Sequence, residues 1–305
     1  MKVKAAFWIS GVSAAIATIL RCIQLLFFFN DRTGFVTDSG VFTYLYCGVL
    51  LISALVSVIL CKHARDTTGV MQRSRSFGAA AASFLLALFM LYCAFVLFLE
   101  TYTFQNYSVT YFIEPQHVMA HTPMAVLSAL FGIAGVILGV CWLRGGKLPG
   151  GIGIVWITAV LWGLYFMVLT FMTHSAAATT QENMFTVGGG ALMLLFLLQE
   201  SKLLSGIGGR KVAQYMYVFG LPAAMLWLTY VISNTVLMLF GRGYAAEMPY
   251  VLQLSMLVIA IHAVTVLFCL RNRAVFTPSF DLNHQNSVRS ERKEAVKSRT
   301  NERFN

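Results

Sequence analysis

Long apolar runs alternate with short polar connections along almost the whole chain. A bilayer core about 30 Å thick is crossed by about 20 mostly apolar residues in a helix. Eight runs reach that length: residues 5–29, 41–61, 77–99, 121–143, 152–173, 184–203, 213–240 and 248–270. No connection between them is long enough to fold as a separate domain. The pattern therefore predicts eight transmembrane spans.

The spans are expected to be helices. Lipid offers no hydrogen bonds to the backbone, so only α-helices and closed β-barrels cross membranes. Barrel strands alternate apolar and polar residues, and the stretch from Ala80 to Phe98 has no such alternation. The predicted fold class is an all-α polytopic membrane helix bundle over residues 1–270. The lipid bilayer is its first expected partner.

Composition agrees with this class. Hydrophobic residues make up 58% of the chain and charged residues 11%, whereas soluble domains carry about 25% charged residues. All six cysteines lie in or at the edge of predicted spans, and none forms a Cys-x-x-Cys pair. A disulfide framework or a zinc ribbon is therefore not expected.

The basic residues predict the orientation. With eight spans, 19 of the 22 lysines and arginines fall on one side; Arg32 and Arg242 fall on the other, and Arg21 lies inside the first span. Basic loops stay in the cytoplasm during insertion. We therefore expect a membrane protein with both termini cytoplasmic. The net charge of +10 is explained by topology, and no nucleic-acid partner is expected.

Residues 271–305 are polar and carry eight basic side chains. Such a segment buries too little apolar surface to fold, so it is predicted to be a disordered basic cytoplasmic tail. Its cations either bind anionic lipid headgroups, at about 1 kcal/mol each near the surface, or remain solvated and only enforce the topology.

A weak internal repeat suggests two four-helix repeats. Similar short sequences recur at offsets of 148, 143 and 142 residues, beginning at Trp8 and Trp156, Phe42 and Phe185, and Phe77 and Phe219. Transporters are often built from such duplications. Chance matches within a narrow composition are the alternative.

Small residues predict where helices touch. Gly135 and Gly139 are four residues apart, as are Ser128 and Gly132. Residues at this spacing share a helix face, and small side chains let two backbones approach closely in lipid. The fourth span is therefore expected to pack tightly against a neighbour.

The usual catalytic signatures are absent from the sequence. It contains no His-Glu-x-x-His, no P-loop and no Gly-x-Ser-x-Gly elbow. No catalytic residue and no cofactor is therefore predicted.

One group of residues has the composition of a metal site. Glu114, His117 and His121 follow one another at intervals of three and four, and two imidazoles with a carboxylate can bind zinc. Pro115 suits the first turn of a short helix, and Thr122-Pro123 suggests the start of the fourth span. His174 and Glu182, in the next connection, are further candidate ligands. The alternative is a pair of histidines in an interfacial loop.

Arg21 is the most informative single residue. It lies eight residues before the predicted end of its span, or about 12 Å below the boundary. An arginine at that depth costs several kcal/mol unless it is paired or hydrated. Gln24 shares its helix face, while Asn234 and Gln253 are expected at similar depth in other spans. These four residues form the predicted ligand-binding set.

The position of Arg21 also predicts a positive charge that attracts anions. No acidic residue is expected at the depth of Arg21 in any span, so its charge would remain available to an anionic solute. The alternative is that Arg21 snorkels outward or ties helices together.

Two short motifs carry a resemblance. The stretch from Arg21 to Leu26 reads Arg-Cys-Ile-Gln-Leu-Leu, and residues 31–35 read Asp-Arg-Thr-Gly-Phe. This resembles the opening of uncharacterised multi-span membrane proteins of Clostridia-type bacteria, whose second motif is one residue longer. The resemblance covers about 20 residues. It implies a bacterial plasma membrane and brings no activity with it.

Three hypotheses of function follow from these observations. The buried Arg21 and the repeat favour a protein that binds or transports a small, anionic solute. The scarcity of polar residues in the spans favours a non-enzymatic membrane sensor or assembly partner. An intramembrane enzyme is the third hypothesis.

Overall fold

The protein is an all-α bundle of membrane-spanning helices, as the sequence predicts. The computed structural model describes residues 2–30, 36–62, 75–107, 115–145, 151–173, 180–207, 209–241 and 248–276. Within these ranges, eight helical segments are long and apolar enough to cross a membrane. An isolated β-bridge joins Phe29 to Val36 across the first connection. The eight predicted spans are thereby confirmed.

The helices are longer than the apolar runs that predicted them. Their bounds are α1 Lys2–Phe28, α2 Val41–Cys61, α4 Phe77–Tyr107, α5 Pro115–Arg144, α6 Ile152–Val155, α7 Ile157–Thr173, α8 Thr180–Asn183, the π-helical turn η1 Met184–Gly188, α9 Gly189–Leu204, α10 Gly209–Leu239 and α11 Tyr250–Phe276. The segments α8, η1 and α9 follow one another without a gap and form one span.

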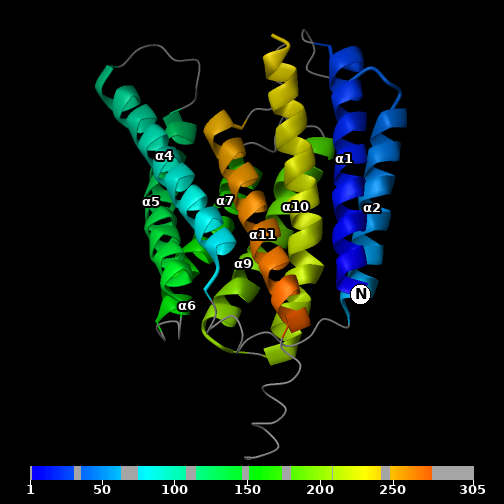
Figure 1. The fold of residues 1–305 in the computed structure, drawn as a ribbon. Helices are drawn as coiled ribbons and strands as arrows, with labels where there is room; N and C mark the ends of the chain where they lie inside the picture. The colour runs from blue at the N-terminus through cyan, green and yellow to red at the C-terminus, as the bar shows by residue number, and fades with distance from the viewer. Residues whose placement is uncertain are drawn as a thin grey trace, which may run out of the picture.

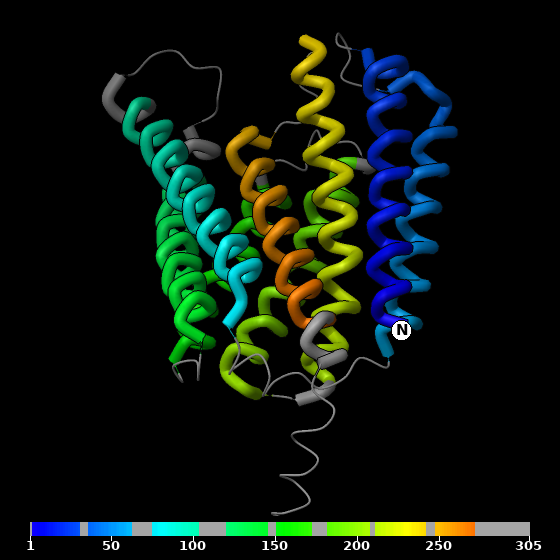
Figure 2. Tube along the Cα trace, viewed as in Figure 1, coloured from blue at the N-terminus to red at the C-terminus, as the bar shows by residue number. Residues whose placement is uncertain are grey.

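Helix α10 stands at the centre of the bundle. It contacts α1, α2, α9 and α11, while α1 pairs with α2 at one edge and α4 pairs with α5 at the other (Figures 1 and 2). In its apolar window 72% of the residues of α10 are buried, against 28% for α1 and for α2. The edge pair α1–α2 therefore faces lipid over most of its surface, and α10 supplies the core.

Helices α9 and α11 approach α10 closely at Gly220. A Cβ atom there would lie 2.6 Å from Cδ2 of Phe196 and 2.9 Å from Cδ1 of Leu267. We expect Gly220→Ala to lower the free energy of unfolding by about 1–3 kcal/mol, because overpacking displaces the core. The matched control is Gly48→Ala on α2, where a Cβ meets nothing within 4 Å. Equal melting temperatures of the two variants in detergent would contradict this close packing.

The predicted contact through small residues is made between α4 and α5. A Cβ on Gly135 would lie 3.1 Å from Cβ of Ala87 and 3.2 Å from the backbone oxygen of Ser83. A Cβ on Gly139 would lie 2.9 Å from Cε1 of the Phe84 ring. The small residues of α5 thus form the surface on which α4 rests, as the sequence pattern predicts.

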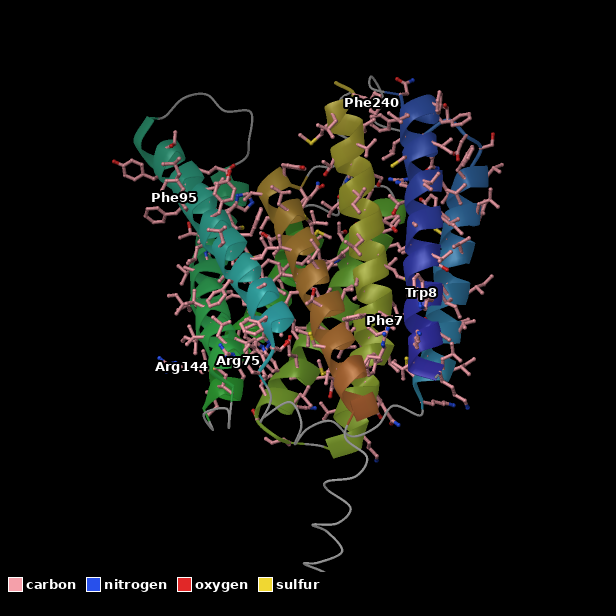
Figure 3. The ribbon with its side chains drawn as sticks, viewed as in Figure 1. Phe7, Trp8, Arg75, Phe95, Arg144 and Phe240 are labelled. Atoms are coloured by element: carbon pink, nitrogen blue, oxygen red, sulfur yellow. The ribbon has the colours of Figure 1, made fainter. Side chains whose placement is uncertain are left out.

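The outer surface of the bundle suits lipid. Large apolar side chains such as Trp8, Phe27 and Phe95 are more than 60% exposed, and two of them are labelled in Figure 3. On a soluble protein so much exposed apolar surface would mark an interaction site. In a membrane it is covered by acyl chains.

The charges are separated along the bundle. Within the described residues every lysine and arginine except Arg21 lies at the end where α1 begins, which we call the basic end. They are Lys2, Lys4, Lys62, Arg75, Arg144, Lys202, Arg210, Lys211, Arg271 and Arg273. Figure 3 shows Arg75 and Arg144 at this end and Phe240 at the opposite end. The end of α11 also lies at the basic end (Figure 1).

Two helix boundaries differ from those expected. Helix α5 begins at Pro115 and continues through Pro123, so Thr122-Pro123 lies inside the helix and does not cap it. Proline is tolerated inside membrane helices because neighbouring groups satisfy the backbone atoms that it frees. Helix α11 continues to Phe276, six residues into the predicted tail, and the rest of the tail lies outside the described residues. The internal repeat stays a prediction.

Candidate functional site

Arg21 is buried in the bundle, where neighbouring side chains surround its guanidinium. Its side chain is 1% exposed. Its Nη1 donates hydrogen bonds to Oε1 of Gln24 at 2.7 Å and to the hydroxyl of Tyr46 at 3.2 Å. The rings of Tyr46 and Phe185 lie 5.6 Å and 5.9 Å from the guanidinium carbon, within reach of cation–π attraction. The expectation that Arg21 and Gln24 face the bundle is thereby confirmed.

An acidic partner accompanies Arg21, which the sequence analysis did not expect. Nη2 of Arg21 lies 3.9 Å from Oε1 of Glu182, a side chain that is about nine-tenths buried. The expectation that no acidic residue shares this depth is therefore wrong. The helix containing Glu182 begins at Thr180, four residues before the predicted start of its span, and so brings the carboxylate into the bundle.

A π-helical turn shapes the site. Residues Met184–Gly188 form η1, and the hydroxyl of Thr186 donates to the backbone oxygen of Glu182 at 2.9 Å. Such turns are rare and occur often at functional sites. The turn directs Phe185 between two tyrosines, whose ring centroids lie 5.9 Å away for Tyr46 and 5.7 Å for Tyr230. These three rings form a stacked wall beside Arg21.

Gln24 connects α1 to the start of α2 through hydrogen bonds. Its Nε2 donates to Oδ2 of Asp38 at 2.9 Å and to the hydroxyl of Thr43 at 2.8 Å. Asp38 also accepts hydrogen bonds from the backbone N–H groups of Gly40 and Phe42, as acidic residues at helix starts do. Because both ends of the Gln24 amide are engaged, this residue orients Arg21 more than it offers atoms to a ligand.

Asn234 on α10 and Gln253 on α11 form a pair of buried amides. Nδ2 of Asn234 donates to Oε1 of Gln253 at 3.3 Å. Tyr230 lies one helical turn before Asn234 on α10, and its ring stacks on that of Phe185. Within the described residues Oδ1 of Asn234 is buried and has no hydrogen-bond partner. A buried amide oxygen without a donor is costly, so this atom is suited to receive one.

All four residues of the predicted ligand set therefore belong to one region, which we call the Arg21 cluster. It comprises Arg21, Gln24, Asp38, Tyr46, Glu182, Phe185, Tyr230, Asn234 and Gln253. Arg21 and Gln24 pair with each other, Asn234 pairs with Gln253, and the stacked rings of Phe185 and Tyr230 lie between the two pairs. With Glu182 and Asp38 present, the cluster has no excess positive charge.

The structure contains a second buried cluster that the sequence analysis missed. Glu200 is fully buried. Its Oε1 lies 3.0 Å from Nε2 of His262, and its Oε2 accepts a hydrogen bond from Nε1 of Trp156 at 3.1 Å. Trp156 occupies the break between α6 and α7, which turns its indole towards α9. We call these three residues the Glu200 cluster; Glu200 lies four residues before the end of α9.

The predicted metal site is only partly within the described residues. Glu114 and the side chain of His117 lie outside them. His121 is buried, and its Nδ1 lies 3.4 Å from Oε2 of Glu100. Glu182 belongs to the Arg21 cluster, and His174 lies outside the described residues. No group of three metal-ligating side chains occurs in the described part of the chain, so the zinc site stays a prediction.

Comparisons with known proteins leave the site to be interpreted from its own geometry. No protein-family model, no curated protein and no solved structure matches the chain.

Proposed function

We propose that this integral membrane protein binds a small solute in the Arg21 cluster and transports it. The observation that supports the proposal is the buried pair of Arg21 and Glu182, 3.9 Å apart. Ionic groups inside membrane spans are costly and usually mark a pathway or a ligand site. Apolar side chains could hold α1 against α2 and α10 at lower cost, because replacing a buried ion pair by apolar residues is often stabilising.

The separation of the pair supports solute entry between the two groups. At 3.9 Å the two charged atoms are farther apart than a hydrogen bond allows. A polar group of the solute can therefore bridge the two charged groups.

The arrangement favours a solute with an anionic group and a hydrogen-bond donor. An anionic group on the solute pairs with Arg21 and displaces Glu182, and a cationic group on the same solute then pairs with Glu182. The buried Oδ1 of Asn234 accepts a further donor. A zwitterion fits better than a simple anion, because Glu182 and Asp38 cancel the positive field that the sequence alone predicts.

The proposed location is a bacterial plasma membrane, with the basic end in the cytoplasm. The grouping of the described lysines and arginines at one end supports this orientation. Arg21 lies seven residues before the far end of α1, so the Arg21 cluster would be nearer the outside.

Labelling from one side of the membrane tests this topology. In a cysteine-free background, Gln181→Cys should react with an impermeant maleimide added outside, and Lys202→Cys should react only after the membrane is permeabilised. The two residues begin and end one span, so each is the control for the other. Labelling of Gln181→Cys only from the inside would reverse the orientation.

A solute screen tests the proposed function. Purified protein in detergent is mixed with amino acids, other zwitterions and small carboxylates, and the melting temperature is measured. A solute present at 100 times its Kd stabilises the folded protein by about 2.7 kcal/mol. A solute that binds should therefore raise the melting temperature measurably. If no solute class raises the melting temperature, the proposal is rejected.

Uptake separates transport from the alternative function. Proteoliposomes loaded with the unlabelled hit should accumulate the labelled hit by exchange. Binding without uptake would favour the alternative of a membrane sensor or assembly partner. In that case the buried Glu200 cluster would serve only to hold its helices together.

A further inference from the structure

An apolar groove runs along the lipid-facing side of the bundle between α1 and α10. Its volume is about 450 Å³, and α11 contributes Val264 to one side. Small residues of α1, namely Gly11, Ala14 and Ala15, face Ala224 of α10. A Cβ on Gly11 would meet nothing within 4 Å. The two helices thus leave space that their own side chains do not fill.

The polar groups of this groove are already engaged. The hydroxyl of Thr18 donates to the backbone oxygen of Ala14 at 2.7 Å and approaches the hydroxyl of Thr229 at 3.4 Å. The hydroxyl of Ser10 pairs with that of Ser57 at 2.9 Å. The groove therefore offers an apolar surface, and an occupant needs no hydrogen-bonding groups inside it.

The groove has the length of an acyl chain in one leaflet. It is lined on α1 from Phe7 to Ile19, which is about 18 Å along the helix axis. Half of a hydrocarbon core of about 30 Å is about 15 Å. An acyl chain that enters at the basic end would fill the groove and end near the middle of the membrane.

A cation stands at the entrance of the groove. The guanidinium carbon of Arg271 lies 5.6 Å from the ring centroid of Phe7 and 4.7 Å from that of Phe268. Figure 3 shows Phe7 near the basic end. Lys4 is one helical turn before Phe7 on the same face. No hydrogen bond or ion pair of the Arg271 side chain occurs within the described residues, so its five N–H donors remain available to a phosphate.

We propose that this groove is a binding site for an anionic phospholipid of the leaflet at the basic end. One acyl chain lies between α1 and α10, and the phosphate binds Arg271 with Lys4 beside it. Arginine forms two parallel hydrogen bonds to phosphate oxygens, while the rings of Phe7 and Phe268 fix its position. The site is independent of the solute site and of the residues beyond Phe276.

Lipid titration by native mass spectrometry tests the site. Dioleoylphosphatidylglycerol and dioleoylphosphatidylcholine share their acyl chains and differ in net charge. The wild-type protein should bind one phosphatidylglycerol molecule more tightly than phosphatidylcholine. Arg271→Gln should weaken phosphatidylglycerol binding by roughly fivefold, the factor for one arginine at an anionic surface. It should weaken phosphatidylcholine binding less, because the choline cation offsets the charge of the phosphate. Arg144→Gln, an exposed arginine at the same end, is the charge control and should have no effect.

Filling the groove tests the acyl-chain half of the proposal. Gly11→Leu should weaken binding of both lipids at least fivefold, and Ala15→Leu on the same wall serves as a second filling variant. Gly48→Leu on α2, another glycine with open space, should bind lipid like the wild type. Equal effects of Arg271→Gln and Arg144→Gln, or of Gly11→Leu and Gly48→Leu, would reject the site. A dimer that Gly11→Leu disrupts would instead assign the groove to a second copy of the chain.

Discussion

Arg21→Leu is expected to lower the free energy of unfolding by about 3–5 kcal/mol, the usual cost of removing one partner of a buried ion pair. The substitution leaves the Glu182 carboxylate about nine-tenths buried without its cation. It also removes the hydrogen bonds to Gln24 and Tyr46. Unfolding in mixed detergent, followed by circular dichroism, measures the loss.

A second substitution separates the charge from the packing. Arg21→Leu combined with Glu182→Leu removes both charges, and we expect it to recover most of the lost stability. Arg144→Leu, an exposed arginine at the basic end, should change stability by no more than about 0.5 kcal/mol. If the double variant is as unstable as Arg21→Leu, the two residues do not act as a pair.

The Glu200 cluster should show a loss of similar size. His262→Leu leaves a fully buried carboxylate with only Trp156 to stabilise it, so we expect a loss of about 3–5 kcal/mol. Glu200→Gln should lower the free energy of unfolding by less than about 1.5 kcal/mol, the usual net contribution of one hydrogen bond. Its amide can still accept the hydrogen bond from Trp156 and donate one to His262.

The ordering of these two variants is the decisive comparison. If Glu200 is charged, His262→Leu should lower the melting temperature more than Glu200→Gln does at one fixed pH. If Glu200→Gln is equally harmful, the charge on Glu200 does not determine the stability of this cluster.

The fold could be predicted from the sequence because lipid imposes a single strong constraint. Every backbone group in a span must be satisfied internally, so long apolar runs indicate helices. The burial of Arg21 followed from counting residues to the end of its span. The small residues around Gly135 likewise predicted the tight contact of α5 with α4.

The partners of Arg21 could not be obtained in the same way. Glu182 lay outside the predicted span because the apolar run begins at Met184, whereas the helix begins at Thr180. The π-helical turn that directs Phe185 towards Arg21 has no signature in hydropathy. Asn234 and Gln253 were matched to Arg21 by depth, but they pair with each other.

The Glu200 cluster was missed for a related reason. A hydropathy window tolerates one acidic residue near the end of a span, so Glu200 did not interrupt its run. A buried glutamate and a histidine in different spans were the available signal. Their pairing depends on the break at Trp156 and on the packing of three helices. Neither the break nor the packing can be predicted from hydropathy.

The central claim is that the solute binds between Arg21 and Glu182, and a titration tests it most directly. The affinity of the best solute from the screen is measured calorimetrically for three proteins. They are the wild type, the neutral double variant Arg21→Gln with Glu182→Gln, and the control Glu200→Gln. We expect the double variant to bind at least roughly 30-fold more weakly, which corresponds to about 2 kcal/mol, and the control to remain within roughly twofold. An unchanged affinity in the double variant would contradict the account.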